Sequence, residues 1–318
     1  MPAVGNWKLE SQRKEYGKAL VELGKKRTDI VVLDADLSSS TQTAMFSQAF
    51  PERFFNCGIA EANMMDTAAG LAASGKTVFA SSFAVFGTGR CYDQIRQSIA
   101  YTKMNVKIVV SHAGITVGGD GASHQTFEDI ALMRVLPNMT VIVPADAPET
   151  RKVIFEIAES KGPTYVRIGR ADVPTITDQN DKFEIGKASI ARDGEDITLI
   201  GTGIMVSRCL LAAEELKTHK ISARVINMST IKPIDKKTII KCARETGAIV
   251  TAEEHSMLEG LGSAIAMTLG ENASVPMRRV GIPDVFGESG DSDELMVKYG
   301  LTAENIVNAS HEVISMMN

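Results

Sequence analysis

Cysteines are few in this 318-residue sequence, and none of the four belongs to a CxxC pair. Their isolated positions (Cys57, Cys91, Cys209 and Cys242) predict neither a zinc site nor a disulfide framework, so we expect a reducing, cytoplasmic setting. Apolar runs of the ~18 residues needed to cross a bilayer are also missing, and the N-terminal segment turns polar at once. We therefore expect neither membrane association nor a secretion signal.

Charge of one sign is not concentrated in any segment. The formal net charge is −5, and the chain has no run of five or six like charges. Nucleic-acid binding depends on clustered Lys and Arg side chains that neutralise phosphates. We therefore expect no nucleic-acid partner.

Short apolar stretches typical of buried strands alternate with longer amphipathic stretches typical of helices. The strand-like stretches are residues 29–36, 77–82, 106–112, 139–146 and 164–169, then 196–203, 223–228, 248–254 and 277–282. This alternation predicts an α/β fold of two domains, each a mostly parallel sheet flanked by helices. The Thr-, Asp-, Asn- and Pro-rich segment 171–186 is interpreted as the connection. We place the first domain at residues 1–182 and the second at 183–318.

Polar side chains gather where the strands of the first domain are predicted to end. The stretches concerned are residues 34–40, 81–86, 111–124 and 167–170. In an open α/β sheet, ligands bind at the carboxyl ends of the strands. We therefore expect the functional site there. The glycines of segment 201–206 lack the third glycine and the later acid of a dinucleotide-binding turn, so they predict only a strand-to-helix connection.

Glu61 follows the segment GIA at the predicted start of a helix rich in small apolar residues. A lone glutamate there is usually an ordinary first-turn residue, favoured by the helix dipole. A small-residue helix is suited to close packing at an interface, which would partly desolvate this carboxylate. Such a group suits proton exchange with a heteroaromatic nitrogen.

Phe83 and Phe86 lie three residues apart beyond the strand that ends near residue 82. Two rings at such a position are either core side chains or a stacking surface for a flat heterocycle. The spacing alone does not decide between these interpretations.

A glycine-rich loop after the next strand carries His112, Asp120 and His124. Two histidines and an acid in one such loop indicate a site for a polar substrate. Zinc is the alternative, but the sequence offers no convincing third ligand.

Together these segments resemble the C-terminal portion of transketolase, a thiamine-diphosphate-dependent family, over essentially the whole chain. The resemblance rests on the GIAE segment, the aromatic pair, the histidine loop, an Arg before the first strand, an A-D-L-x-x-S turn after it, and an Arg shortly before a proline. The matching positions outside the aromatic pair are Arg13, Ala35, Asp36, Leu37, Ser40, Glu61, His112, Gly118, Asp120, Gly121, His124, Gln125 and Arg170.

The resemblance implies roles for five residues around the cofactor. Glu61 would bond N1′ of the aminopyrimidine ring and act in catalysis, Phe86 would stack on that ring, and Phe83 would line its pocket. Asp36 would lie near the cofactor. Arg90 would stand at the pocket's edge, where Gly89 replaces a Tyr that the family often has.

The resemblance also implies a substrate site. His112 and Asp120 would bind substrate hydroxyls, and His124 the reacting oxygens, with both histidines counted as catalytic. Arg13, Ser40 and Arg170 would clamp the phosphate of a sugar, because guanidinium forks suit a phosphate dianion.

The family's metal motif pairs a GDG segment with a later Asn, and no Asn follows residues 119–121 at the required spacing. No metal ligand is therefore assigned to this chain. The resemblance implies a separate N-terminal transketolase subunit that holds the cofactor's diphosphate through Mg or Ca. We expect an α2β2 assembly in which this chain also pairs with its own copy.

The expected reaction is transfer of a two-carbon ketol unit from a ketose phosphate to an aldose phosphate, in pentose phosphate metabolism. Deoxyxylulose-phosphate synthase is an alternative, because Arg90 and Tyr92 follow the aromatic pair in that enzyme's order. The beta subunit of 2-oxoacid dehydrogenases is another, although the His112 loop favours a hydroxylated substrate. A non-catalytic assembly subunit is the third alternative.

Overall fold

Seven strands form the sheet of the first half of the chain, in the order β12-β6-β7-β5-β4-β2-β3. The computed structural model describes residues 4–317. The strands, in sheet order, are Thr230–Lys232, Thr140–Ile142, Thr164–Arg167, Val106–Val110, Thr77–Ser81, Ile30–Asp34 and Phe54–Asn56. All neighbours pair in parallel except β12, which is antiparallel to β6. The parallel strands therefore present their carboxyl ends at one edge.

Helices cover both faces of this sheet, since successive side chains of a buried strand point to opposite faces. Val31 and Leu33 of β2 pack in a cluster with residues of α4, η3 and α6, whereas Ile30 and Val32 pack with α1 and α7. These helices are α4 Glu61–Ala73, η3 Ile95–Tyr101, α6 Asp129–Val135, α1 Gln12–Lys26 and α7 Ala147–Glu159. Shorter helical segments are α2 Ser38–Thr41, α3 Ala44–Ala49, η1 Pro51–Arg53, η2 Phe86–Arg90, α5 Tyr92–Gln94 and η4 Ile115–Asp120.

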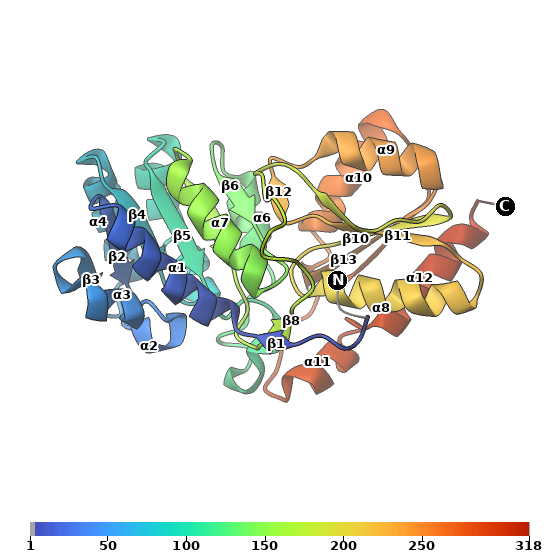
Figure 1. Ribbon diagram of the computed structural model, residues 1–318, viewed down its shortest axis with the longest axis horizontal. Helices are drawn as coiled ribbons and strands as arrows, with labels where there is room; N and C mark the ends of the chain where they lie inside the picture. The colour runs from blue at the N-terminus through green and yellow to red at the C-terminus, as the bar shows by residue number, and fades with distance from the viewer. Residues whose placement is uncertain (1–3, 318) are drawn as a thin grey trace.

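The second half of the chain forms a five-stranded sheet in the order β14-β13-β10-β11-β9. Its strands are Met277–Ile282, Ile249–Ser256, Ile197–Gly201, Ala223–Asn227 and Ser189–Arg192, of which only the last is antiparallel to its neighbour. The flanking helices are α8 Met205–Thr218, α9 Lys236–Thr246, α10 Leu261–Asn272, α11 Ser292–Lys298 and α12 Ala303–Ser315. The two sheets lie side by side along the long axis of the molecule (Figure 1).

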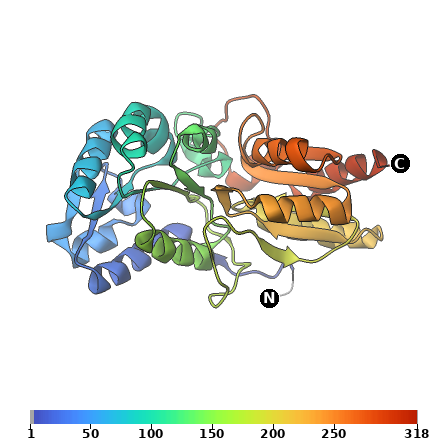
Figure 2. The same cartoon turned by 90° about the horizontal axis from the view of Figure 1, so that it is seen from above.

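The two halves are interlocked at their junction. β12 comes from the second half of the sequence but pairs with β6 of the first sheet. Glu149 of α7 accepts hydrogen bonds from Asn227 and Ser229 at 2.9 and 2.6 Å. The buried apolar cluster that includes β2 and α4 continues into α9 and α10 without a break. Figure 2 shows the two halves side by side, with green segments of the first half next to yellow and orange segments of the second.

The predicted fold class is confirmed, and every strand-like stretch contains a strand. Five strands were not foreseen, because each is too short or too polar to show a period: β3, β9, β12, and the pair β1 Leu9–Glu10 and β8 Val173–Pro174. β8 lies inside the segment interpreted as a linker. The division at residue 182 falls between β8 and β9 and stays a prediction.

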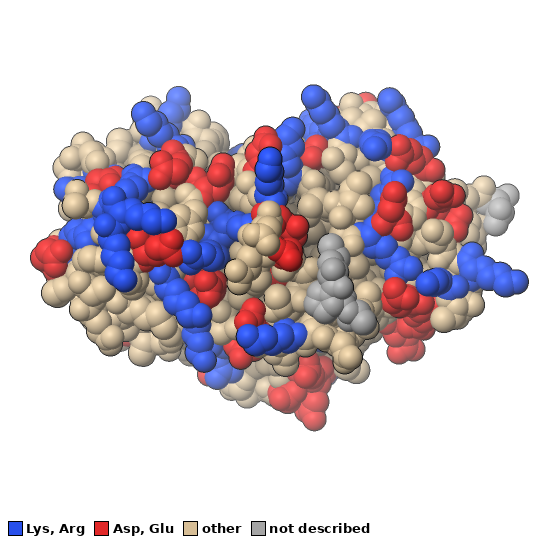
Figure 3. Space-filling model, viewed as in Figure 1, with Lys and Arg blue, Asp and Glu red and all other residues tan. Residues whose placement is uncertain are grey.

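The face shown in Figure 3 carries acidic and basic side chains mixed together. On α1 and α7, for example, Arg151 pairs with Glu15 at 3.6 Å and also with Glu22. Within residues 4–317, no helix is both long enough and apolar enough to span a membrane.

Candidate active site

Glu61 is the first residue of α4, as predicted, and its side chain is only 2% exposed. Nη1 of Arg90 lies 3.1 Å from both of its carboxylate oxygens. Arg90 is half-exposed and ends the π-helical segment η2. The buried carboxylate is therefore neutralised by a cation that reaches in from the surface.

The aromatic pair belongs to a larger group of rings. Phe83 stacks on His112 with centroids 3.7 Å apart, and on Phe86 at 6.1 Å. His124 meets the edge of Phe86 at 5.3 Å. Three of the segments singled out in the sequence thus converge, because β4 and β5 are neighbours whose ends carry Phe83 and His112.

The position of Arg90 indicates whether Glu61 and Phe86 could hold an aminopyrimidine ring between them. Its guanidinium lies over the Phe86 ring, with Cζ 4.2 Å from the ring centroid, while it donates to Glu61. A planar group with N–H donors is thus already held by Phe86 on one side and Glu61 at its edge. The aminopyrimidine of thiamine diphosphate is also planar and has polar edge atoms, so the residues present fit it.

His112 adopts a left-handed backbone conformation, with φ at +59°, and its side chain is 3% exposed. Its Nδ1 lies 2.8 Å from the hydroxyl of Ser111. Burial, with the nearby charges of Arg13, Arg170 and His124, lowers the pKa of His112 to about 3. The ring is therefore neutral at neutral pH, with one nitrogen able to donate a hydrogen bond and the other able to accept one.

Arg13 and Arg170 lie together, as the sequence predicts for an anion site. Arg13 donates to the backbone carbonyls of Ser40 and Arg170, each at 2.8 Å, and Arg170 donates to the carbonyl of Val117 at 2.6 Å. Burial and the neighbouring charge of Arg170 lower the pKa of Arg13. Two adjacent like charges repel, and a bound anion would relieve that repulsion.

Asp34 holds the turn that places Ser40, a role not recognised in the sequence. Its buried carboxylate accepts from the amide of Leu37 at 2.6 Å and from the hydroxyls of Thr41 and Thr43 at 2.7 and 2.9 Å. Burial raises the pKa of Asp34 despite these donors. The DAD segment was the available signal, because Asp34 is the last residue of an apolar, fully buried strand, whereas Asp36 lies beyond its end.

Within residues 4–317, neither Asp36 nor Asp120 makes a side-chain hydrogen bond or an ion pair with the ring group. Asp36 is exposed at the end of β2 and accepts from Asn56 at 3.1 Å. Asp120 is exposed at the end of η4, the turn that lies between the two loop histidines. The structure therefore gathers Glu61, Phe83, Phe86, Arg90, His112 and His124 in one group, and Arg13, Ser40 and Arg170 in a second.

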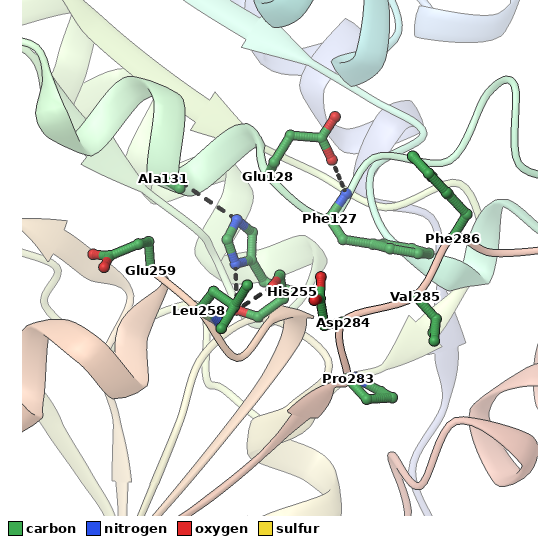
Figure 4. Close-up of a pocket in the computed structure, with 11 residues that line it drawn as sticks. Phe127, Glu128, Ala131, His255, Leu258, Glu259, Pro283, Asp284, Val285 and Phe286 are labelled. Atoms are coloured by element: carbon green, nitrogen blue, oxygen red, sulfur yellow. Dashed lines mark hydrogen bonds between the residues drawn. The ribbon is translucent and has the colours of Figure 1, made fainter.

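No cluster of three or more His, Cys, Asp or Glu in the described part of the chain could hold a metal ion. A cavity of about 350 Å³ opens at the junction of the two halves instead (Figure 4). His255, on its wall, accepts from the amide of Ala131 at 3.4 Å and donates to the Ser256 carbonyl at 2.9 Å. None of the predicted site residues lines this cavity, so we place the site at the ring group.

Comparison with known proteins relates both halves of the chain to transketolase. Residues 11–175 match the pyrimidine-binding domain of transketolase, and residues 186–306 match the transketolase C-terminal domain. A protein of Methanocaldococcus jannaschii assigned as a transketolase C-terminal section is 55% identical, over 93% of this chain and 94% of that protein. A 6-deoxy-6-sulfo-D-fructose transketolase subunit of a Clostridium species is 47% identical, over 98% and 97%.

Among solved structures, a split-gene transketolase described as an inactive beta4 tetramer superposes with a TM-score of 0.92. It is 51% identical to this chain, and the superposition covers 97% of this chain and 100% of that one. This chain therefore belongs to the transketolase family, whose members use thiamine diphosphate. Within the family it is a transketolase-type subunit made of the pyrimidine-binding and C-terminal domains.

Proposed function

We propose that this chain is the C-terminal subunit of a split transketolase. It transfers a two-carbon ketol unit between a ketose phosphate and an aldose phosphate, and it acts only with an N-terminal subunit. That partner holds the cofactor's diphosphate through a divalent cation. When bound, the cofactor supplies the carbon nucleophile that receives the ketol unit.

The observation that carries the proposal is the pairing of Glu61 with a planar cation stacked on Phe86. In the proposed enzyme Glu61 bonds the pyrimidine ring in place of Arg90. Phe86 fixes the plane of that ring, and Phe83 keeps His112 against it. His112, which is neutral at neutral pH, and His124 hold substrate oxygens, while Arg13 and Arg170 hold the anionic end of the sugar.

Reconstitution tests the proposal. The chain is purified alone and together with an N-terminal transketolase subunit, and each sample is assayed with xylulose 5-phosphate and ribose 5-phosphate. We expect turnover only in the complex, and only with thiamine diphosphate and a divalent cation. Turnover by the chain alone, or conversion of pyruvate but not of sugars by the complex, would contradict the proposal.

The anionic group of the donor is a separate question, because the Clostridium relative is named for a sulfonated fructose and a relative from Phocaeicola vulgatus for apulose 4-phosphate. Two guanidinium groups serve a sulfonate as well as a phosphate. Parallel assays with 6-deoxy-6-sulfofructose and fructose 6-phosphate compare the two groups on one carbon skeleton. We expect the phosphate to give the higher kcat/KM, and a preference for the sulfonate would correct the proposed substrate class.

A further inference from the structure

Strand β13 ends in three ionisable residues at the junction of the two halves. Glu253, Glu254 and His255 are 1%, 5% and 0% exposed. Because side chains alternate along a strand, Glu253 and His255 point to one face and Glu254 to the other. Glu253 accepts from the amides of Leu261 and Gly262 at the start of α10, within the second half of the chain.

Glu254 points instead into the loop of the first half that carries His112, Asp120 and His124. Its Oε1 accepts a hydrogen bond from the backbone amide of Thr116 at 2.8 Å. The loop is shaped around this carboxylate. A Cβ atom on Gly114 would lie 2.3 Å from the Glu254 carboxyl group, so only glycine leaves room for it.

A buried cation completes the attachment. Arg167 of β7 donates to the backbone carbonyl of Glu254 at 2.8 Å and lies 3.8 Å from its carboxylate. The same guanidinium donates to Asp129 at 2.8 Å, and Tyr165 donates to Asp129 at 2.6 Å. Burial raises the pKa of Glu254, and the positive charge of Arg167 opposes that rise. Glu254 is thus held by Arg167, a residue of the first sheet.

Other contacts from the second half secure the same loop at its outer side. Ser292 donates to the carbonyl of Thr116 at 3.0 Å, and Ser289 to that of Gly119 at 2.7 Å. Gln125, next to His124, donates to the carbonyl of Glu288 at 2.9 Å. In these three bonds the acceptor is a backbone carbonyl. Among residues 4–317, Glu254 is the residue of the second half that accepts from a backbone amide of the loop.

We propose that Glu254 is a positioning residue that lets the C-terminal domain hold the 112–124 loop in its substrate-binding shape. Without this acceptor the Thr116 amide would be buried and unsatisfied, and the loop would rearrange to expose it. The histidines at the two ends of the loop would then lose their fixed separation. The consequence for catalysis rests on the proposed function, whereas the effect on the loop does not.

Amide hydrogen exchange of the isolated chain tests the effect on the loop. Glu254→Ala removes the acceptor and should raise exchange at residues 115–121 by about tenfold or more. Glu254→Gln keeps a neutral acceptor and should give a smaller rise, about threefold to fivefold. The matched control is Glu253→Gln, which should raise exchange at residues 261–262 and leave residues 115–121 unchanged.

If Glu254→Ala does not fold, the comparison of the two Gln variants decides the matter. Exchange at residues 115–121 within twofold of wild type in Glu254→Gln, or an equal rise in Glu253→Gln, would overturn the proposal.

Kinetics of the assembled enzyme test the catalytic consequence. Glu254→Gln should raise KM for the donor sugar about fivefold or more, while kcat and proton exchange at the cofactor's C2 stay within about twofold. A general loss of structure would lower all three together. Faster exchange in the loop with unchanged KM would place the 112–124 loop outside the substrate site. That result would refute the catalytic part of this proposal and leave the chain's family membership untouched.

Discussion

Glu61 and Arg90 form a pair in which one member is buried and the other is half-exposed. An exposed ion pair stabilises a protein little, but a buried carboxylate without a partner is costly. Arg90 therefore supplies the buried Glu61 side chain with a hydrogen-bonding partner. In the proposed enzyme Glu61 would hold the pyrimidine ring at the position that Arg90 occupies against Phe86.

Replacing Glu61 separates this role from that of an ordinary first-turn glutamate. Glu61→Gln should leave the fold intact but lower kcat of the assembled enzyme by about 10²–10⁴-fold, because an amide cannot exchange the required proton. Proton exchange at C2 of the bound cofactor, followed by NMR, locates the loss in cofactor activation. Glu304→Gln, an exposed first-turn position of α12, is the matched control and should change activity little. Wild-type C2 exchange in Glu61→Gln would refute the role, however low the overall activity.

His112 should make the stability of the isolated chain depend on pH. Its folded pKa of about 3 lies below the ordinary value of 6.5, so the unfolded chain binds a proton first as the pH falls. Stability is therefore lost as pH drops below about 6.5, by about 1–2 kcal/mol from this group at pH 5. His112→Asn is the suitable variant, because Asn tolerates the left-handed backbone.

Urea unfolding of wild type and His112→Asn at pH 8, 7 and 5 measures this effect. From pH 8 to 7, the free energy of unfolding of wild type minus that of His112→Asn should stay nearly constant. At pH 5 this difference should be smaller, because only wild type loses the contribution of His112. A difference that stays constant down to pH 5 would show that His112 is protonated normally in the folded chain.

At the scale of elements, the anion site is assembled from three separate segments. Arg13 comes from the first turn of α1, Ser40 from α2, and Arg170 from the turn after β7. Gln12 links two of them, because its side chain accepts from the Gly169 amide at 3.1 Å and donates to the Pro144 carbonyl at 2.9 Å. The relative position of the two arginines thus depends on packing between α1 and the sheet edge.

Arg13→Ala and Arg170→Ala should each raise KM for phosphorylated substrates by about tenfold or more, since a charge-assisted contact contributes roughly 1.5–3 kcal/mol. The KM for an unphosphorylated sugar should change much less. Arg151→Ala, on the outer surface of α7, provides the control. If both site variants kept KM within about twofold of wild type, the anion site would lie elsewhere.

At the scale of the whole molecule, the interlocked junction predicts cooperative unfolding. β12 completes the first sheet, and a single buried cluster runs through both halves. Neither half can unfold without exposing apolar surface of the other.

Scanning calorimetry of the isolated chain should therefore show one transition, with a calorimetric enthalpy close to the van't Hoff value. A protein made of residues 1–182 alone should be unstable, since it lacks β12 and the covering of the junction. Two resolved transitions, with the truncated protein folding normally, would show that the halves are independent domains.

The alternation of apolar runs was enough to predict both sheets, because burial of a parallel strand depends on a local pattern of side chains. The start of α4 at Glu61 and the aromatic pair after β4 were likewise read from neighbouring residues. The short edge strands β3, β9 and β12 were missed, since a strand of three or four residues is stabilised by its partner rather than by its own period.

Residue types and their order along the chain were therefore enough to determine the fold class and the family, while the edge of the sheet that carries the site stays a prediction. Tertiary structure alone decided which charges meet. Arg90 reaches Glu61 across 29 residues, and Glu254 reaches Thr116 across 138. Such pairs depend on how two sheets pack and on which side chains lose water together, and neither property is encoded in the local period of the sequence.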